Sequence, residues 1–211
     1  YLPKLAAGIS TPCFAVSEPD VGAHPKYLKT QAVRDGDDYI INGEKAYLTN
    51  GPIADLILLL AITGVDEGRK RYSAFLVSRE TPGIEETDGT FIDFLQPSCH
   101  CGMAFTDVRV PADALLGPEG MAFETLSLPM RRVEDAISAA NKAGAFRYQI
   151  DRLTVELSGS DIDKEQLVEI GRLAAAPDGL SALAYRSAEL LDLDLNGNAE
   201  AAETITAAGR D

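Results

Sequence analysis

The run Phe14-Ala-Val-Ser-Glu-Pro-Asp-Val-Gly22 is the stretch of the chain best suited to hold a ligand. A short apolar strand leads into a Ser-Glu-Pro turn and then reaches a glycine. Such a turn exposes backbone N–H donors beside a small hydroxyl, here that of Ser17. This arrangement suits the binding of a flat polar ring or of a phosphate group.

Two further motifs follow in the chain. Residues 43–51 read Gly-Glu-Lys-Ala-Tyr-Leu-Thr-Asn-Gly, and residues 105–120 contain Val-Arg-Val-Pro-Ala-Asp-Ala-Leu-Leu-Gly-Pro. Taken alone, Tyr47 and Leu48 are also compatible with ordinary strand residues, and Asn50-Gly51 with an ordinary turn. The order and spacing of the three motifs favour a functional interpretation.

Together these motifs resemble those of the acyl-CoA dehydrogenase family, flavoenzymes that oxidise the α,β carbon-carbon bond of acyl-CoA thioesters with FAD. The resemblance extends over residues 1 to about 147. It implies FAD as cofactor, an acyl-CoA thioester as substrate and an oxidoreductase of fatty acid metabolism. It also implies a homo- or hetero-oligomer, with electron-transfer flavoprotein as the electron acceptor.

The resemblance assigns the flavin contacts to the first two motifs. In the family, the aromatic ring at the place of Tyr47 lies against the flavin, and the hydroxyl at the place of Thr49 bonds near its reactive edge. The residues expected to bind FAD are Phe14, Val16, Ser17, Gly22, Tyr47, Leu48 and Thr49.

Two positions depart from the family pattern. The family serine that reaches the FAD pyrophosphate and the thioester arm is Ala23 here, and the following aspartate is His24. One donor to the phosphates is therefore missing. Ala23 and Arg132 are the residues that the resemblance places beside the substrate, with the thioester between the flavin and the helix that bears Arg132.

The resemblance also implies a carboxylate that removes the α-proton of the thioester. In most members this glutamate lies late in the C-terminal domain, beyond the region that this chain covers. In a minority it directly precedes the arginine matched by Arg132, where this chain has Arg131. Glu134 is the candidate that remains on this helix, and its spacing from Arg131 equally fits a surface ion pair.

Three interpretations stay open. The chain is part of an acyl-CoA dehydrogenase-like flavoprotein whose missing pieces lie elsewhere, or a non-catalytic binding or assembly subunit, or an unrelated β-barrel followed by helices. The sequence leaves the acyl chain open. Because the first residue is Tyr1 and no signal peptide is visible, we expect the chain to begin inside a longer gene product or after processing.

The formal net charge of −14 is spread over the whole chain. Nucleic acid is excluded as a partner, because phosphate neutralisation needs a basic stripe. FAD and CoA are also anions, so their binding requires local basic residues. The candidates for this role are Lys26, Lys29 and the Arg131-Arg132 pair. No apolar run approaches the ~20 residues of a membrane span.

The three cysteines, Cys13, Cys99 and Cys101, form no regular disulfide framework, which predicts a reducing, cytoplasmic location. Cys99-His100-Cys101 invites a metal hypothesis. The only other histidine is His24, and no second cysteine pair completes a tetrahedral zinc set. We therefore expect no metal.

Short strand-like runs fill residues 12–110, including a two-residue hairpin at Asn42-Gly43. After Gly120, alanine, leucine and charged residues recur at helical spacing. Breaks are expected near Ser158–Ser160, Pro177–Gly179 and Asn196–Asn198, giving four helices. The sequence therefore predicts an α+β fold. An antiparallel β-barrel or sandwich domain at 1–118 precedes an incomplete antiparallel helical bundle at 119–211.

Overall fold

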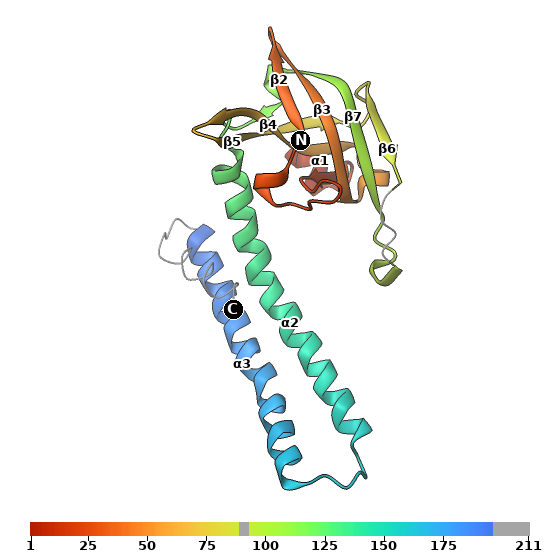
Figure 1. Ribbon diagram of the computed structural model, residues 1–211, viewed down its shortest axis with the longest axis vertical. Coiled ribbons are helices and arrows are strands. Elements are labelled where there is room, and N and C mark those ends of the chain that lie inside the picture. The colour runs from red at the N-terminus through yellow and green to blue at the C-terminus, as the bar shows by residue number, and fades with distance from the viewer. Residues whose placement is uncertain (89–92, 196–211) are drawn as a thin grey trace. The chain divides into compact units, whose positions relative to one another are not determined.

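The computed structural model describes residues 1–88 and 93–195. The chain divides into two compact units, Tyr1–Ser127 and Leu128–Asp211 (Figure 1). The first unit is built on a β-sheet, and the second consists of two long helices in its described part. The predicted α+β class is confirmed.

In its described residues, 1–88 and 93–127, the first unit contains eight strands, one short α-helix and several single helical turns. The strands are β1 Pro12–Ala15, β2 Gln31–Asp35, β3 Asp38–Thr49, β4 Leu56–Asp66, β5 Arg69–Ser78, β6 Ile84–Thr87, β7 His100–Pro111 and β8 Leu115–Leu116. The helical segments are α1 Leu2–Ala6, the 3₁₀ turns Pro25–Tyr27, Gly51–Ile53, Asp93–Leu95 and Ala112–Ala114, and the π-helical turn Phe123–Ser127.

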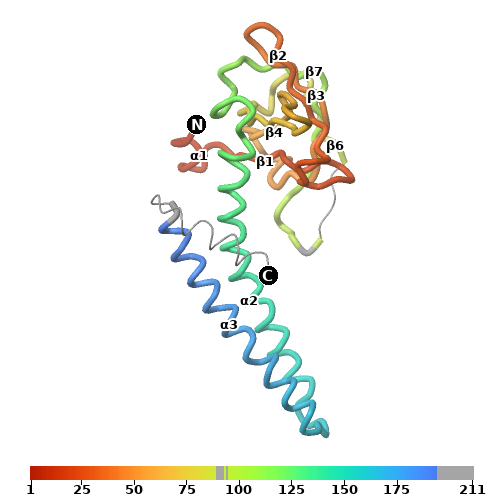
Figure 2. Tube along the Cα trace, turned by 60° about the vertical axis from the view of Figure 1, so that its left-hand side comes forward, coloured from red at the N-terminus to blue at the C-terminus, as the bar shows by residue number. Residues whose placement is uncertain are grey.

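The strands form one sheet in the order β6-β7-β3-β2-β4-β5-β8, and β1 pairs with β4 outside this path. The pairs of β4 with β1 and with β2 are parallel, and the other pairs are antiparallel. The trace in Figure 2 shows the sheet curving back on itself. The predicted antiparallel β-domain is therefore confirmed as a mostly antiparallel sheet, with parallel pairing of β4 to β1 and β2.

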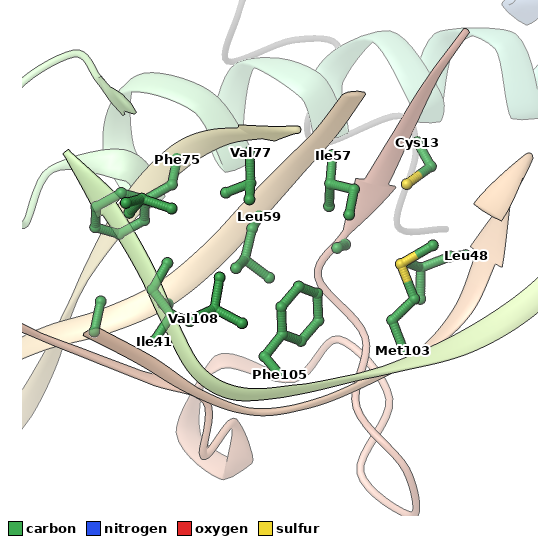
Figure 3. Close-up of a cluster of buried hydrophobic side chains, with 14 of the residues drawn as sticks. Cys13, Ile41, Leu48, Ile57, Leu59, Phe75, Val77, Met103, Phe105 and Val108 are labelled. Atoms are coloured by element: carbon green, nitrogen blue, oxygen red, sulfur yellow. The ribbon is translucent and has the colours of Figure 1, made fainter. Parts of the chain in front are cut away.

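The core of this unit lies between the strands of the curved sheet (Figure 3). β4 is apolar almost throughout, as a strand covered on both faces should be. Tyr39 and Phe75 meet edge to face with ring centroids 5.0 Å apart. The largest fully buried apolar side chains are Tyr39, Phe75, Leu28, Ile41, Leu48, Ile57, Leu59, Met103, Val77 and Val108.

The predicted hairpin at Asn42-Gly43 is wrong. β3 runs through these residues without turning, and the hairpin that joins β2 to β3 lies at Gly36-Asp37. The Asn42 side chain instead donates to Asp107 Oδ1 at 3.1 Å and accepts the Asp107 backbone N–H at 2.9 Å. An extra residue in β7 at this place makes a bulge. Asn42 thus accepts the backbone N–H of Asp107, a residue of the bulge in the neighbouring strand β7.

The second unit contains α2 Leu128–Glu156 and α3 Lys164–Leu195. The expected break at Ser158–Ser160 is confirmed by the loop between the helices. Asp163 caps α3 reciprocally: its carboxylate accepts the Gln166 N–H at 2.8 Å, and its own N–H donates to the Gln166 side chain at 3.1 Å.

The predicted break at Pro177–Gly179 is wrong, because α3 continues through Pro177. Four residues further along the helix, the Ser181 hydroxyl donates to the Pro177 carbonyl at 2.7 Å. The described part of the second unit therefore has two long helices, where the predicted breaks at Ser158–Ser160 and Pro177–Gly179 would give three. The break expected at Asn196–Asn198 lies outside the described residues.

The two long helices are antiparallel, since Ala136 packs with Leu190 and Arg147 pairs with Asp178. Small residues on both helices line a groove of about 460 Å³ between them. Several large apolar side chains are exposed, among them Ile137, Leu167 and Tyr185. Two helices cannot bury all of their apolar faces against each other. The predicted incomplete antiparallel bundle is confirmed in this form.

Candidate flavin-binding site

The first two motifs lie side by side, at the exit of β1 and in the middle of β3. The Ala46 N–H donates to the Ser17 carbonyl at 2.8 Å. One residue earlier, Lys45 Nζ donates to the Val16 carbonyl at 3.0 Å. Main-chain and side-chain hydrogen bonds therefore join the two segments that carry the expected flavin contacts.

A bulge in β3 determines how this part of the strand faces solvent. Lys45 is opposite Met103 on β7, but Leu48 is opposite Cys101, so Ala46 and Tyr47 supply one extra residue. Tyr47 has φ of +59° and its side chain is 47% exposed. A left-handed aromatic residue is sterically costly, and such strain concentrates at functional sites. Tyr47 therefore presents its ring to solvent at a strained position.

The other predicted flavin contacts occupy different environments. Thr49 is exposed on β3, whereas Leu48 is fully buried in the core. Phe14, Val16 and Ser17 are half-buried. The structure thus brings Ser17 close to the bulge that carries Tyr47, while the Leu48 side chain points away from solvent.

Gly22 closes a tight turn with Glu18, since the two residues exchange backbone hydrogen bonds of 3.0 and 3.1 Å. Its φ of +60° lies in the left-handed region that favours glycine. Ala23 and His24 follow in exposed positions. An exposed alanine offers no hydroxyl to a phosphate group.

The residues fit the ring end of FAD better than its pyrophosphate end. The ring end fits: an exposed, strained tyrosine, a threonine hydroxyl two residues further on and half-buried Ser17 lie on joined strands. At the pyrophosphate end, Ala23 cannot supply the side-chain donor. Backbone groups and nearby cations would have to hold the phosphates there.

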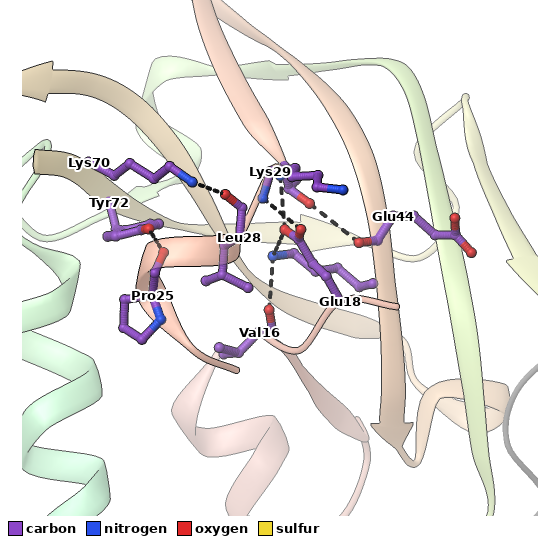
Figure 4. A network of polar contacts seen from close by, with 10 residues as sticks. Val16, Glu18, Pro25, Leu28, Lys29, Glu44, Lys70 and Tyr72 are labelled. Carbon is purple, nitrogen blue, oxygen red and sulfur yellow. Dashed lines mark hydrogen bonds and ion pairs between the residues drawn. The ribbon is translucent and has the colours of Figure 1, made fainter. Parts of the chain in front are cut away.

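A buried polar network joins the segments that carry these residues (Figure 4). Glu18 Oε1 lies 3.0 Å from Lys45 Nζ, and both side chains are almost fully buried. Burial alone would raise the pKa of Glu18, but hydrogen bonds from Thr30 and the charge of Lys45 hold it below its ordinary value. Burial lowers the pKa of Lys45, against the attraction of Glu18.

The loop after the first motif is fastened to β5. The Tyr72 hydroxyl donates to the Pro25 carbonyl, and Lys70 Nζ donates to the carbonyls of Lys26 at 2.8 Å and Leu28 at 2.5 Å. Burial, followed by the negative charge of Glu18, raises the pKa of Tyr72 to about 12. Tyr72 therefore remains a neutral hydrogen-bond donor at physiological pH.

A basic pocket of about 480 Å³ lies between this loop and the β4–β5 hairpin. Sequence reasoning named Lys26 but missed the three consecutive cations Arg69, Lys70 and Arg71. The available signal was a basic tripeptide directly after a turn glycine in a strongly acidic chain. The lining residues are Pro25, Lys26, Gly68, Arg69, Lys70, Arg71, Tyr72, Gly120, Phe123 and Glu124.

Arg132, proposed for substrate binding beside Ala23, and Glu134, proposed for proton removal, lie on α2 in the second unit. Arg132 is half-buried and Glu134 is exposed. Arg131 Nε lies 3.7 Å from Asp135 Oδ2, one turn further along the helix. Glu134 is therefore a solvent-exposed carboxylate on the surface of α2.

The cysteines are free thiols. Burial raises the pKa of Cys13 and of Cys101 to about 11 each. His100 Nδ1 lies 3.1 Å from the Ser98 carbonyl oxygen. Within residues 1–88 and 93–195, no three His, Cys, Asp or Glu side chains are grouped to hold a metal ion. The helices in those ranges include none long and apolar enough to cross a membrane.

Comparison with known proteins identifies the family to which the chain is similar. Residues 13–107 match the model of the acyl-CoA dehydrogenase middle domain. The chain is 34% identical over 201 residues to cyclohex-1-ene-1-carbonyl-CoA dehydrogenase of Geobacter metallireducens. That alignment covers 91% of this chain and 52% of the relative. The chain thus spans about half of the length of this relative.

Two solved structures superpose on almost the whole chain. Glutaryl-CoA dehydrogenase of Mycobacterium smegmatis, in complex with FADH2, is 28% identical with a TM-score of 0.73, covering 99% of this chain and 54% of its own. Butyryl-CoA dehydrogenase of Megasphaera elsdenii is 25% identical with a TM-score of 0.75, covering 99% and 56%. The chain belongs to the acyl-CoA dehydrogenase family, of which it carries the middle domain and part of the region that follows.

Proposed function

We propose that this chain is part of an acyl-CoA dehydrogenase-like flavoprotein that oxidises the α,β bond of an acyl-CoA thioester with FAD. The observation that carries the proposal is the joining of Ser17 to the β3 bulge that exposes Tyr47. The FADH2 complex of the related glutaryl-CoA dehydrogenase supports the choice of cofactor. When bound, FAD supplies the two-electron acceptor for this reaction.

Each residue of the site has a proposed task. Tyr47 lies against one face of the flavin ring, and the Thr49 hydroxyl donates to its edge. The half-buried residues Phe14, Val16 and Ser17 line the same surface with backbone groups and one hydroxyl. Gly22 allows the tight turn that brings the backbone towards the phosphates. Leu48 is buried in the core and anchors the part of β3 that carries Tyr47 and Thr49.

The basic pocket is the proposed site for the phosphates of the acyl-CoA. Lys26, Arg69, Lys70 and Arg71 concentrate positive charge in a chain whose net charge is −14. Such a local concentration attracts an anionic ligand to an otherwise repelling surface. Lys70 and Arg71 already contact neighbouring groups, which fixes their positions. Arg132 remains a proposed contact of the thioester end.

A second candidate function is a non-catalytic binding or assembly subunit. Ala23 removes a donor to the phosphates, and Arg131 takes the place of the minority base. Glu134 is exposed on α2. This alternative retains acyl-CoA or partner binding without turnover. In the enzymatic alternative, electrons pass to electron-transfer flavoprotein and the active form is an oligomer.

The visible absorption spectrum of the purified chain, before and after addition of FAD, tests the proposal. A bound flavin gives bands near 370 and 450 nm, approximate values for the isoalloxazine ring. Anaerobic addition of an acyl-CoA panel then bleaches the 450 nm band if the chain oxidises the thioester. Bound flavin without bleaching favours the non-catalytic subunit. No bound flavin at excess FAD contradicts the flavoprotein proposal.

A further inference from the structure

The buried ion pair of Lys45 and Glu18 connects three segments around the candidate site (Figure 4). Lys45 Nζ lies 3.0 Å from Glu18 Oε1 and 3.0 Å from the Val16 carbonyl oxygen. The exposed fractions of the two side chains are 0% and 4%. A buried ammonium requires such partners, because water cannot solvate it.

The Glu18 carboxylate also holds the end of the loop that follows the first motif. Its Oε2 accepts the Lys29 backbone N–H at 2.6 Å, and its Oε1 accepts the Thr30 backbone N–H at 2.9 Å. The Thr30 hydroxyl in turn donates to the Glu44 carbonyl on β3 at 3.4 Å. One carboxylate therefore links β1, the loop and β3.

The connected segments are those that carry the proposed flavin contacts. Ser17 lies between Val16 and Glu18, both of which contact Lys45. Tyr47 follows Lys45 by two residues, inside the bulge. A left-handed tyrosine persists only where its surroundings determine the backbone strongly. The Lys45 contacts and the Ala46–Ser17 hydrogen bond provide that restraint on one side of the bulge.

A gain in folding stability does not by itself account for the buried Lys45–Glu18 ion pair. Replacing a buried ion pair by apolar residues of similar volume is often neutral or stabilising, whereas the ion pair imposes direction on the groups that it contacts. Here the directed groups are the Val16 carbonyl and the Lys29 and Thr30 amides. The pair therefore fixes the geometry of the surface in front of it.

We propose that Lys45 and Glu18 are positioning residues for the flavin: they hold Ser17 and Tyr47 in the arrangement that receives the ring. This inference rests on the proposed function and assigns to the pair no contact with the cofactor. Loss of either partner releases the β1 exit or the bulge, so the ring contacts no longer form together.

The test compares Lys45→Met, which keeps the length of the side chain without its charge, with the core variant Val77→Ala. Val77 is buried in the core on β5 and contacts none of the groups of the pair by hydrogen bond. FAD affinity is measured by quenching of flavin fluorescence, and the shape of the 450 nm band reports the ring environment. Amide hydrogen exchange at Lys29 and Thr30 reports the loop without requiring flavin.

We expect Lys45→Met to weaken FAD binding by about tenfold or more, to alter the 450 nm band and to speed exchange at Lys29 and Thr30. Val77→Ala should keep FAD affinity within about twofold of the wild-type value, even if it lowers the denaturation midpoint as much as Lys45→Met does. Wild-type affinity and an unchanged band in Lys45→Met would overturn the inference. An equal loss of affinity in Val77→Ala would overturn it too.

Glu18→Gln provides a second variant should Lys45→Met not fold. It retains the shape of the side chain and weakens its hold on the backbone amides, so it should give a smaller loss of FAD affinity with the same change in the band. An unaltered affinity and band in a folded Glu18→Gln chain would again overturn the inference. Failure of the wild-type chain to bind FAD would refute the proposed function itself, a result distinct from any difference between variants.

Discussion

The backbone N–H of Ala46 donates to the carbonyl of Ser17 at 2.8 Å. This bond joins the exit of β1 to the middle of β3, two segments that do not pair elsewhere as strands. It places a small hydroxyl beside a bulge that turns a tyrosine outward. Two short motifs that are unremarkable alone thereby become one surface.

Replacement of Tyr47 by alanine should weaken FAD binding by roughly tenfold, because the variant loses one face of the contact with the ring. The stability of the chain should change little, because the ring is about half exposed and alanine keeps the Cβ that makes a φ of +59° costly. Titration of FAD by fluorescence quenching measures the affinity. Tyr148→Ala, at a tyrosine 67% exposed on α2, is the matched control and should bind as wild type.

Glu18 should make folding stability depend on pH in the acid range. Its folded-state pKa lies below the ordinary 4.5, so the unfolded chain binds more protons between the two values. The contribution is present above about pH 4.5 and is lost as pH falls through the folded-state value. Denaturant unfolding followed by circular dichroism at several pH values measures the slope.

The Glu18→Gln variant should lack most of this acid-range slope. At neutral pH it should be less stable than wild type by about 3–5 kcal/mol, because the charge of Lys45 stays buried without its counterion. A variant that keeps the wild-type slope below pH 4.5 would show that other carboxylates are responsible for it.

Gly43→Ala should be strongly destabilising. A Cβ at Gly43 would lie 2.5 Å from Thr30 Oγ1 and 2.7 Å from the Thr30 Cα, so backbone would have to move. We expect a loss about 2 kcal/mol greater than that of Gly68→Ala, where φ is +76° and the space is open. Equal losses in the two variants, measured by denaturant unfolding, would contradict the close approach of β3 to Thr30.

The thiols should differ in their reactivity. Cys13 and Cys101 are buried and burial raises the pKa of each to about 11, so few thiolates form at pH 8. Cys99 is partly exposed and should react first with a disulfide reagent such as Ellman's. Under native conditions we expect one fast thiol, removed by Cys99→Ser, and three after denaturation. Rapid reaction of all three in the folded chain would show that the core opens.

The fold class and the family follow from the sequence because both rest on local patterns. Short β-branched runs separated by turns indicated the sheet, and alanine and leucine at helical spacing indicated the helices. Asn42-Gly43 was misread because the same dipeptide serves a hairpin turn and a bulge, and only the partner strand distinguishes them.

Only the tertiary structure determined the continuity of α3 at Pro177 and the burial of Lys45. Pro177 reads as a helix breaker, yet packing of α3 along α2 keeps the helix continuous around it. Lys45 reads as a surface strand residue, yet it is completely buried because Glu18 and Val16, distant in the sequence, supply its partners. Sequence records the preference of each segment for helix, strand or turn. Burial, bulges and ion pairs arise only where segments distant in the chain meet, and these set the geometry of the candidate site.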